Sequence, residues 1–161
     1  MIAGSGREQL GDLAHRYAYL VDRRELSAAV ELFTADAVLV LPDPPARLDP
    51  VRAYAGRQQI AEALAPLHGI AATMHGILGL VLEPAEPGTA RGWVSGVAHH
   101  VTEHPDGAIT DLVWYLRYAD HYRHDDGRWL IARRELSIEW IEVRPVRRRL
   151  GRSGTSRIAV P

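Results

Sequence analysis

The stretch TDLVWYLRYADHYR, residues 110–123, decides the fold class of this chain. Side chains of alternate residues point to opposite faces of a β-strand. On one parity the side chains are apolar or aromatic: Leu112, Trp114, Leu116, Tyr118 and Tyr122. On the other parity lie the polar Asp111, Arg117 and His121. The alternation predicts a strand whose apolar face looks into the interior of the protein.

Turn residues divide the second half of the chain into extended stretches. The segments EPAEPG (83–88), PDG (105–107) and DDG (125–127) have the composition of tight turns. They separate four expected strands, at residues 73–82, 89–103, 110–123 and 128–143. Short turns between neighbouring strands predict an antiparallel meander.

The first half of the chain is mostly helical in pattern. Apolar residues recur at helical spacing in residues 7–24, 26–33 and 56–67. A short buried strand is expected at residues 37–41, followed by a proline-rich loop at 43–50. Helices that precede the strands indicate an α+β fold. We expect one domain, residues 1–143, and a flexible arginine-rich tail, residues 144–161.

Composition excludes several classes of function. A net charge of −1 gives no field that would attract nucleic acid or an anionic membrane surface. All 19 basic residues are arginine and the chain has no cysteine, so lysine Schiff bases, disulfides and thiolates are excluded. No apolar run approaches the roughly 20 residues of a membrane span. The expectation is a soluble cytoplasmic protein.

Four short motifs resemble those of the SnoaL-like proteins of the nuclear-transport-factor-2-like superfamily. They are Tyr17-x-x-x-Val21-Asp22-Arg23-Arg24-Glu25-Leu26, Leu32-Phe33-Thr34-Ala35-Asp36-Ala37, Thr73-Met74-His75 and Asp126-Gly127-Arg128-Trp129. The resemblance implies a cone-shaped, strongly curved antiparallel sheet wrapped by three N-terminal helices around a ligand cavity. It also implies a homodimer through the outer face of the sheet.

Within this superfamily the chain is most similar to the scytalone dehydratase-like branch. That resemblance implies catalytic roles for Asp22, His75 and His100. It also places Tyr17 and Trp93 against the substrate, Trp93 because Gly92-Trp93 resembles a glycine–aromatic pair of that branch.

Other positions depart from the dehydratase pattern. Two tyrosines that polarise the substrate there correspond to Val21 and Leu41, and a serine and an asparagine fall near Leu116 and Tyr118. These four positions are still expected to line the substrate site. Apolar groups therefore replace much of the polar shell, which puts the scytalone reaction itself in doubt.

A His/His/Asp set in an apolar cavity suits proton transfer at neutral pH. The hypothesis is a cofactor-independent dehydratase, isomerase or cyclase acting on a small apolar polyketide-, terpenoid- or aromatic-like molecule, as in secondary metabolism. Two alternatives remain open: a non-catalytic small-molecule-binding protein and a dimerisation module. The enzyme hypothesis predicts that Asp22 lies within hydrogen-bonding reach of His100. The binding hypothesis predicts a cavity in which Asp22 and the histidines make no hydrogen bonds with one another. The dimerisation hypothesis predicts a cone whose interior is filled by side chains.

Further residues have competing interpretations. His99 and His100 point to opposite faces of one strand, so only one of them can look into a cavity. No His-x-His pair accompanies them, and we expect no metal site. Glu135 and Glu139 share a strand face with Arg133, and they are either catalytic acids or part of an ion pair at a dimer face.

Overall fold

The computed structural model describes residues 4–147 as an α+β fold with one six-stranded curved sheet. The strand order is β2-β1-β6-β5-β4-β3, and all neighbours are antiparallel except β1 and β6, which run parallel. The elements in chain order are α1 (Gly4–Asp22), α2 (Leu26–Val30), β1 (Phe33–Asp43), β2 (Arg47–Ala55), α3 (Gly56–Leu64), the 3₁₀ helix η1 (Ala65–Gly69), β3 (Ala72–Pro84), β4 (Thr89–Glu103), β5 (Ile109–Asp125) and β6 (Arg128–Pro145).

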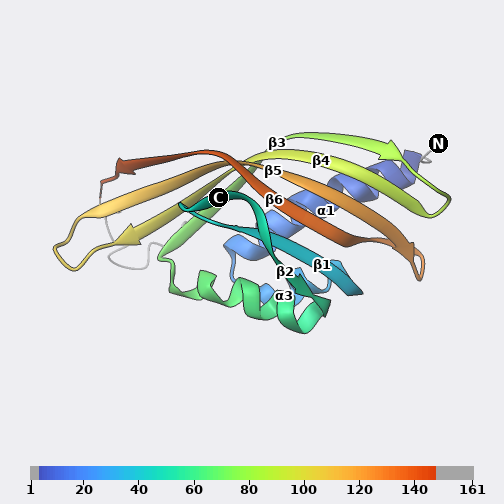
Figure 1. The fold of residues 1–161 in the computed structure, drawn as a ribbon, viewed down its shortest axis with the longest axis horizontal. Helices are drawn as coiled ribbons and strands as arrows, with labels where there is room; N and C mark the ends of the chain where they lie inside the picture. The colour runs from blue at the N-terminus through green and yellow to red at the C-terminus, as the bar shows by residue number, and fades with distance from the viewer. Residues whose placement is uncertain (1–3, 148–161) are drawn as a thin grey trace, which may run out of the picture.

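Figure 1 shows how the sheet and helices are arranged. The long strands β3 to β6 arch over α1, and α3 lies along β1 and β2. The helices thereby close the concave side of the sheet. None of the helices in residues 4–147 is both long and apolar enough to cross a membrane.

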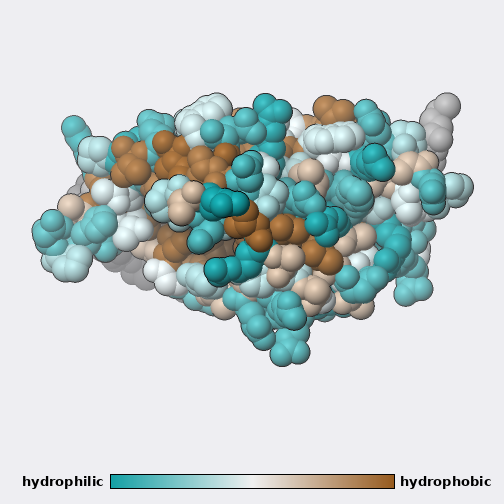
Figure 2. Space-filling model, in the orientation of Figure 1, coloured by the Kyte–Doolittle hydropathy of each residue, from teal (hydrophilic) through white to brown (hydrophobic). Residues whose placement is uncertain are grey.

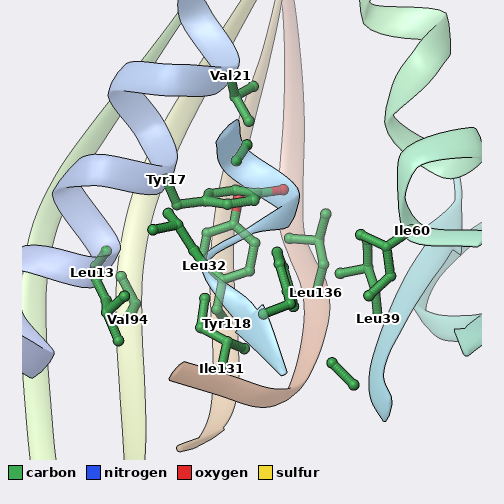
Figure 3. Packing of buried hydrophobic residues seen from close by; sticks show 14 of the residues in the cluster. Leu13, Tyr17, Val21, Leu32, Leu39, Ile60, Val94, Tyr118, Ile131 and Leu136 are labelled. Atoms are coloured by element: carbon green, nitrogen blue, oxygen red, sulfur yellow. The ribbon is translucent and has the colours of Figure 1, made fainter. Parts of the chain in front are cut away.

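The core lies between the helices and the inner face of the sheet. The apolar stripe predicted for the first helix is buried: Leu10, Leu13, Ala14, Tyr17 and Val21. In Figure 3 Tyr17 of α1 lies against Tyr118, and Ile60 of α3 lies beside Leu39. The alternation predicted for residues 110–123 is confirmed in its second half, where Leu116, Tyr118 and Tyr122 are buried while Arg117 and His121 are exposed. In the first half Asp111, which was expected on the polar face, is also buried.

The prediction for residues 43–50 as a loop was wrong, because β2 begins at Arg47. Proline is tolerated in an edge strand, and β2 forms the edge of the sheet beside β1. The helix expected at 56–67 stops at Leu64 and continues as η1. Pro66 explains this change, because it lacks the N–H group that would continue the α-helical hydrogen bonds.

Several strands also extend beyond their predicted limits, β1 most of all. Phe33, expected at the end of a helix, opens β1. The last strand runs two residues past the expected boundary and includes Arg144 and Pro145. The remainder of the predicted arginine-rich tail, from residue 148, lies outside the described residues.

Candidate functional site

A cavity of about 280 Å³ lies between α1, η1 and the inner face of the sheet. Its walls are mostly apolar and aromatic, with two histidines among them. The lining residues are Tyr17, Val21, Leu41, Leu64, Pro66, Leu67, Ile70, His75, His100, Thr102, Leu112, Trp114, Leu116, Tyr118 and Leu136. The exposed Pro66 belongs to this set, so the segment after α3 forms the rim of the cavity. The volume is just below the usual range for small-molecule sites, about 300–1,000 Å³.

His75 lines the cavity and forms a hydrogen-bonded pair with Asp22. Asp22 is the last residue of α1, and His75 lies on β3. The imidazole Nδ1 lies 2.7 Å from Oδ1 of the carboxylate. The backbone N–H of His75 donates to Oδ2 at 2.8 Å, and the hydroxyl of Thr73 donates to Oδ1 at 2.8 Å. Three donors therefore fix the carboxylate in place.

These contacts also determine the charge of Asp22. Burial acts to raise its pKa, but the hydrogen bonds from His75 and Thr73 outweigh burial and lower the pKa below its usual value. The carboxylate is therefore ionised at neutral pH and can only accept hydrogen bonds. Nδ1 of His75 must therefore carry a hydrogen, and in the neutral form of the ring the lone pair lies on Nε2.

His100 faces the same cavity from β4 but has a different partner. Its Nδ1 lies 3.1 Å from the backbone carbonyl oxygen of Leu112. A carbonyl oxygen only accepts, so Nδ1 carries the hydrogen here too. Burial lowers the pKa of His100, against the opposing effect of the Leu112 carbonyl. The ring is therefore neutral at neutral pH and offers a hydrogen-bond acceptor at Nε2.

The two histidines are neighbours, although the carboxylate serves only one of them. Their ring centroids lie 5.9 Å apart in an edge-to-face arrangement, and Trp114 packs 4.5 Å from His100 on its other side. The expectation that Asp22 pairs with His100 was wrong, because Asp22 bonds His75. The reason is topological: α1 ends beside β3, at the sheet edge, rather than beside β4.

Tyr17 and Tyr118 line the cavity beside a buried ion pair. The guanidinium of Arg134 lies 4.5 Å from the Tyr17 ring centroid and 4.3 Å from that of Tyr118. Burial raises the pKa of both tyrosines, against the opposing charge of Arg134. Both phenols therefore stay protonated at neutral pH and are able to donate hydrogen bonds.

The SnoaL-like domain model matches residues 5–135, which is most of the chain. The chain belongs to the SnoaL-like family. No curated protein matches this SnoaL-like chain in sequence.

Solved structures of similar fold cover nearly the whole SnoaL-like domain. A protein from Novosphingobium aromaticivorans, provisionally named scytalone dehydratase, is 20% identical, with 92% of this chain and 95% of that chain covered and a TM-score of 0.70. A hexachlorocyclohexane dehydrochlorinase (LinA) of type 2 is 16% identical, with 89% and 90% covered and a TM-score of 0.72. An NTF2-like protein with a cystatin-like fold, also from N. aromaticivorans, is 19% identical, with 84% and 82% covered and a TM-score of 0.65. At these identities the likeness establishes the fold.

Most predicted site residues of the SnoaL-like domain line the cavity, and Asp22 bonds His75 without lining the cavity itself. Tyr17, Val21, Leu41, Leu116 and Tyr118 all line it. Trp93 does not: it lies on the outer face of the sheet and is 43% exposed. The strand alternation explains this correction, since the neighbouring Val94 faces the core and is fully buried.

Glu135 and Glu139, which the sequence left open as possible catalytic acids, form ion pairs with arginines. Arg133 Nε donates to Glu135 Oε1 at 2.6 Å, and Arg117 Nε lies 3.3 Å from Glu139 Oε1. The glutamates therefore form ion pairs away from the cavity. In residues 4–147, no three acidic or histidine side chains are grouped so that they could hold a metal ion.

Sequence reasoning missed a buried ion pair beneath the tyrosines. Arg134 donates to both oxygens of Asp120, at 2.8 and 2.6 Å, and the hydroxyl of Tyr122 donates to Asp120 at 2.7 Å. The signal was present in the strand pattern. Asp120 continues the parity of Tyr118 and Tyr122, and a charge on an apolar face requires a buried partner.

Proposed function

We propose that this SnoaL-like domain is a cofactor-independent acid–base enzyme of lyase or isomerase type. The observation that carries the proposal is the 2.7 Å contact between Asp22 and His75, whose imidazole lines an apolar cavity. A carboxylate bonded to Nδ1 fixes the imidazole tautomer and stabilises the imidazolium that forms during proton transfer. His75 is then the proton-transferring group, through Nε2.

The chemistry that fits this pair is removal of a proton from carbon. In a dehydration, Nε2 of His75 takes a proton from a C–H bond, and the electron pair of that bond forms the new C=C bond. The C–O bond on the neighbouring carbon breaks, and the imidazolium of His75 returns the proton to the departing hydroxyl, which leaves as water. In an isomerisation the same proton returns to a different carbon. A general acid–base group of this kind is typically worth about 10²–10⁴ in rate.

The other polar groups of the cavity position the substrate. His100 is neutral and offers its Nε2 lone pair, so it accepts a hydrogen bond from a substrate hydroxyl. Tyr17 stays protonated and donates a hydrogen bond to a substrate carbonyl oxygen, which stabilises charge that develops on that oxygen. The apolar walls select a small apolar molecule of the polyketide, terpenoid or aromatic kind, and dehydratase and dehydrochlorinase relatives support elimination on this fold.

The test is proton exchange from carbon, which is observable whatever the leaving group is. A panel of cyclic β-hydroxyketones, enones and aromatic polyketide analogues is incubated with the protein in D₂O and followed by NMR for deuterium incorporation and loss of water. The wild type and His99→Gln are expected to react with the same panel member, and His75→Gln is expected to lose about 10²-fold or more in rate. His99 is the matched control because it lies next to His100 but on the outer face. Equal rates for wild type and His75→Gln would refute the proposal, as would binding without exchange throughout the panel.

We also propose a homodimer through the outer face of the sheet. Met74, Val81, Trp93 and Trp140 leave large apolar surfaces exposed there, between 43% and 67%. Figure 2 shows separate apolar patches among polar side chains on the face in view. The Arg133–Glu135 and Arg117–Glu139 pairs offer both charge signs to a second copy.

Sedimentation equilibrium tests the dimer. Trp140→Glu is expected to shift the protein from dimer to monomer, whereas Tyr19→Glu, an equally exposed aromatic on α1, leaves the dimer intact. A wild type that sediments as a monomer at 100 µM, roughly the concentration at which a Kd near 1 µM would give nearly full dimer, would contradict it.

A further inference from the structure

Arg24 has an unusual backbone conformation for its residue type. Its φ is 62°, in the left-handed region that favours glycine. It follows the end of α1 as the helix-terminating residue, with its N–H donating to Val21 and that of Glu25 donating to Leu20. Glycine is the usual residue at this position. An arginine that holds this conformation points to a function for its side chain.

The guanidinium of Arg24 joins three parts of the site. Nη1 donates to the carbonyl oxygens of Val21 at 3.0 Å and Asp22 at 3.3 Å, at the C-terminal end of α1. Nη1 also donates to the hydroxyl oxygen of Thr73 at 2.7 Å, on β3. Nη2 donates to the carbonyl oxygen of Ile70 at 3.0 Å, in the rim of the cavity. One side chain thus ties the helix end, the rim and the first residues of β3 together.

The contact with Thr73 fixes which groups donate and which accept in this hydrogen-bond network. A hydroxyl group has one hydrogen to donate, and an arginine can only donate. Because Arg24 donates to the Thr73 oxygen, the hydroxyl hydrogen is free to point at Asp22 Oδ1, 2.8 Å away. That oxygen is the one bonded to Nδ1 of His75.

We propose that Arg24 is a positioning residue for the Asp22–His75 pair, acting through the hydroxyl of Thr73. Arg24 does not line the cavity and does not contact the carboxylate side chain. It orients the Thr73 hydroxyl, which with His75 keeps the carboxylate ionised and fixed. The inference rests on the proposed function, because that function gives the Asp22–His75 pair its catalytic role. The hydrogen bonds from Arg24 through Thr73 to Asp22 can be tested without any substrate.

The experiment measures the pKa of the Asp22 carboxyl by carbon-detected NMR on aspartate-labelled protein, with Asp22→Asn used to assign the signal. Arg24→Gly suits the backbone conformation and removes only the side chain, so the variant is expected to fold. Arg24→Gly and Thr73→Val are each expected to raise the pKa of Asp22 by about half a unit or more. Arg23→Gly, which removes an exposed neighbour paired with Glu25, is the matched control and is expected to change nothing.

A double variant separates the proposal from a direct charge effect. If Arg24 acts through Thr73, adding Arg24→Gly to Thr73→Val raises the pKa of Asp22 by less than about 0.2 further units. Additive shifts would show that the arginine charge acts through space and would overturn the proposal. An unchanged pKa in Arg24→Gly, with only the melting temperature altered, would also overturn it and leave Arg24 a helix cap. Should Arg24→Gly fail to fold, Thr73→Val with an unchanged pKa overturns it alone. None of these arms requires turnover, so they stand apart from a failure of the exchange assay.

Discussion

The imidazole rings of His75 and His100 meet edge to face with their centroids 5.9 Å apart, yet only His75 has a carboxylate partner. Nδ1 of His100 donates to the Leu112 carbonyl oxygen instead. This difference gives the two histidines different roles in the proposed reaction. His75 moves a proton with the help of Asp22, and His100 remains neutral and orients the substrate.

The buried His100 makes the stability of the protein depend on pH. Burial lowers its pKa in the folded chain, whereas in the unfolded chain it binds a proton near pH 6.5. Below about pH 6.5 the unfolded state therefore binds more protons, and the free energy of unfolding falls until the lower folded pKa is reached. Urea unfolding at pH 7.5 and pH 5.5 is expected to show a smaller decrease for His100→Gln than for wild type. His68 is exposed, so His68→Gln should lose as much unfolding free energy between the two pH values as wild type. An equally large loss in His100→Gln would refute the claim that His100 has a lowered pKa in the folded protein.

Breaking the Asp120–Arg134 pair is expected to destabilise the fold strongly. Both side chains are essentially inaccessible to water, so Asp120→Asn leaves a buried guanidinium without its carboxylate. The expected loss in the free energy of unfolding is about 3–5 kcal/mol. Asp36→Asn removes the partner of Arg123 from an exposed pair and should cost no more than about 1 kcal/mol. Chemical denaturation measures the free energy of unfolding of both variants. Similar losses in Asp120→Asn and Asp36→Asn would contradict the claim that the buried pair stabilises the fold more than the exposed pair.

Close packing at Gly92 predicts that even a methyl group is harmful there. A Cβ atom would lie 2.6 Å from Cε2 of Tyr122 and 3.2 Å from Cδ2 of Leu82. Tyr122 cannot easily move, because it is buried and its hydroxyl donates to Asp120. Gly92→Ala is expected to lower stability by about 1–3 kcal/mol, the usual cost of overpacking. Gly79→Ala on β3 has open space around it and serves as the control, and equal stability of the two variants would disprove the close contact.

Much of the fold was predictable because its signals are local. Alternation in β5 and the turn residues on either side of it placed three long strands with little error. The edge strand β2 was missed because its signal is not local: Pro50 is typical of a loop, and only pairing with β1 makes the segment a strand.

The site was less predictable because it depends on distant contacts. Asp22 and His75 are 53 residues apart, and no spacing rule shows that α1 ends beside β3 rather than β4. Trp93 could have been excluded from sequence alone, since it and His100 are an odd number of residues apart on one strand and so face opposite sides. Arg24 has no sequence signal, because its role depends on a left-handed backbone conformation visible only in the structure.

The most direct test of the central claim compares wild type with Asp22→Asn in the carbon proton-exchange assay, on the panel member that reacts fastest. Asparagine keeps the size of the side chain but removes the charge that fixes the tautomer of His75 and stabilises its imidazolium. The account predicts that the exchange rate falls by about 10²-fold or more. A rate within about threefold of wild type, a difference of roughly 0.65 kcal/mol in barrier, would contradict the claim that Asp22 and His75 act together as the acid–base pair.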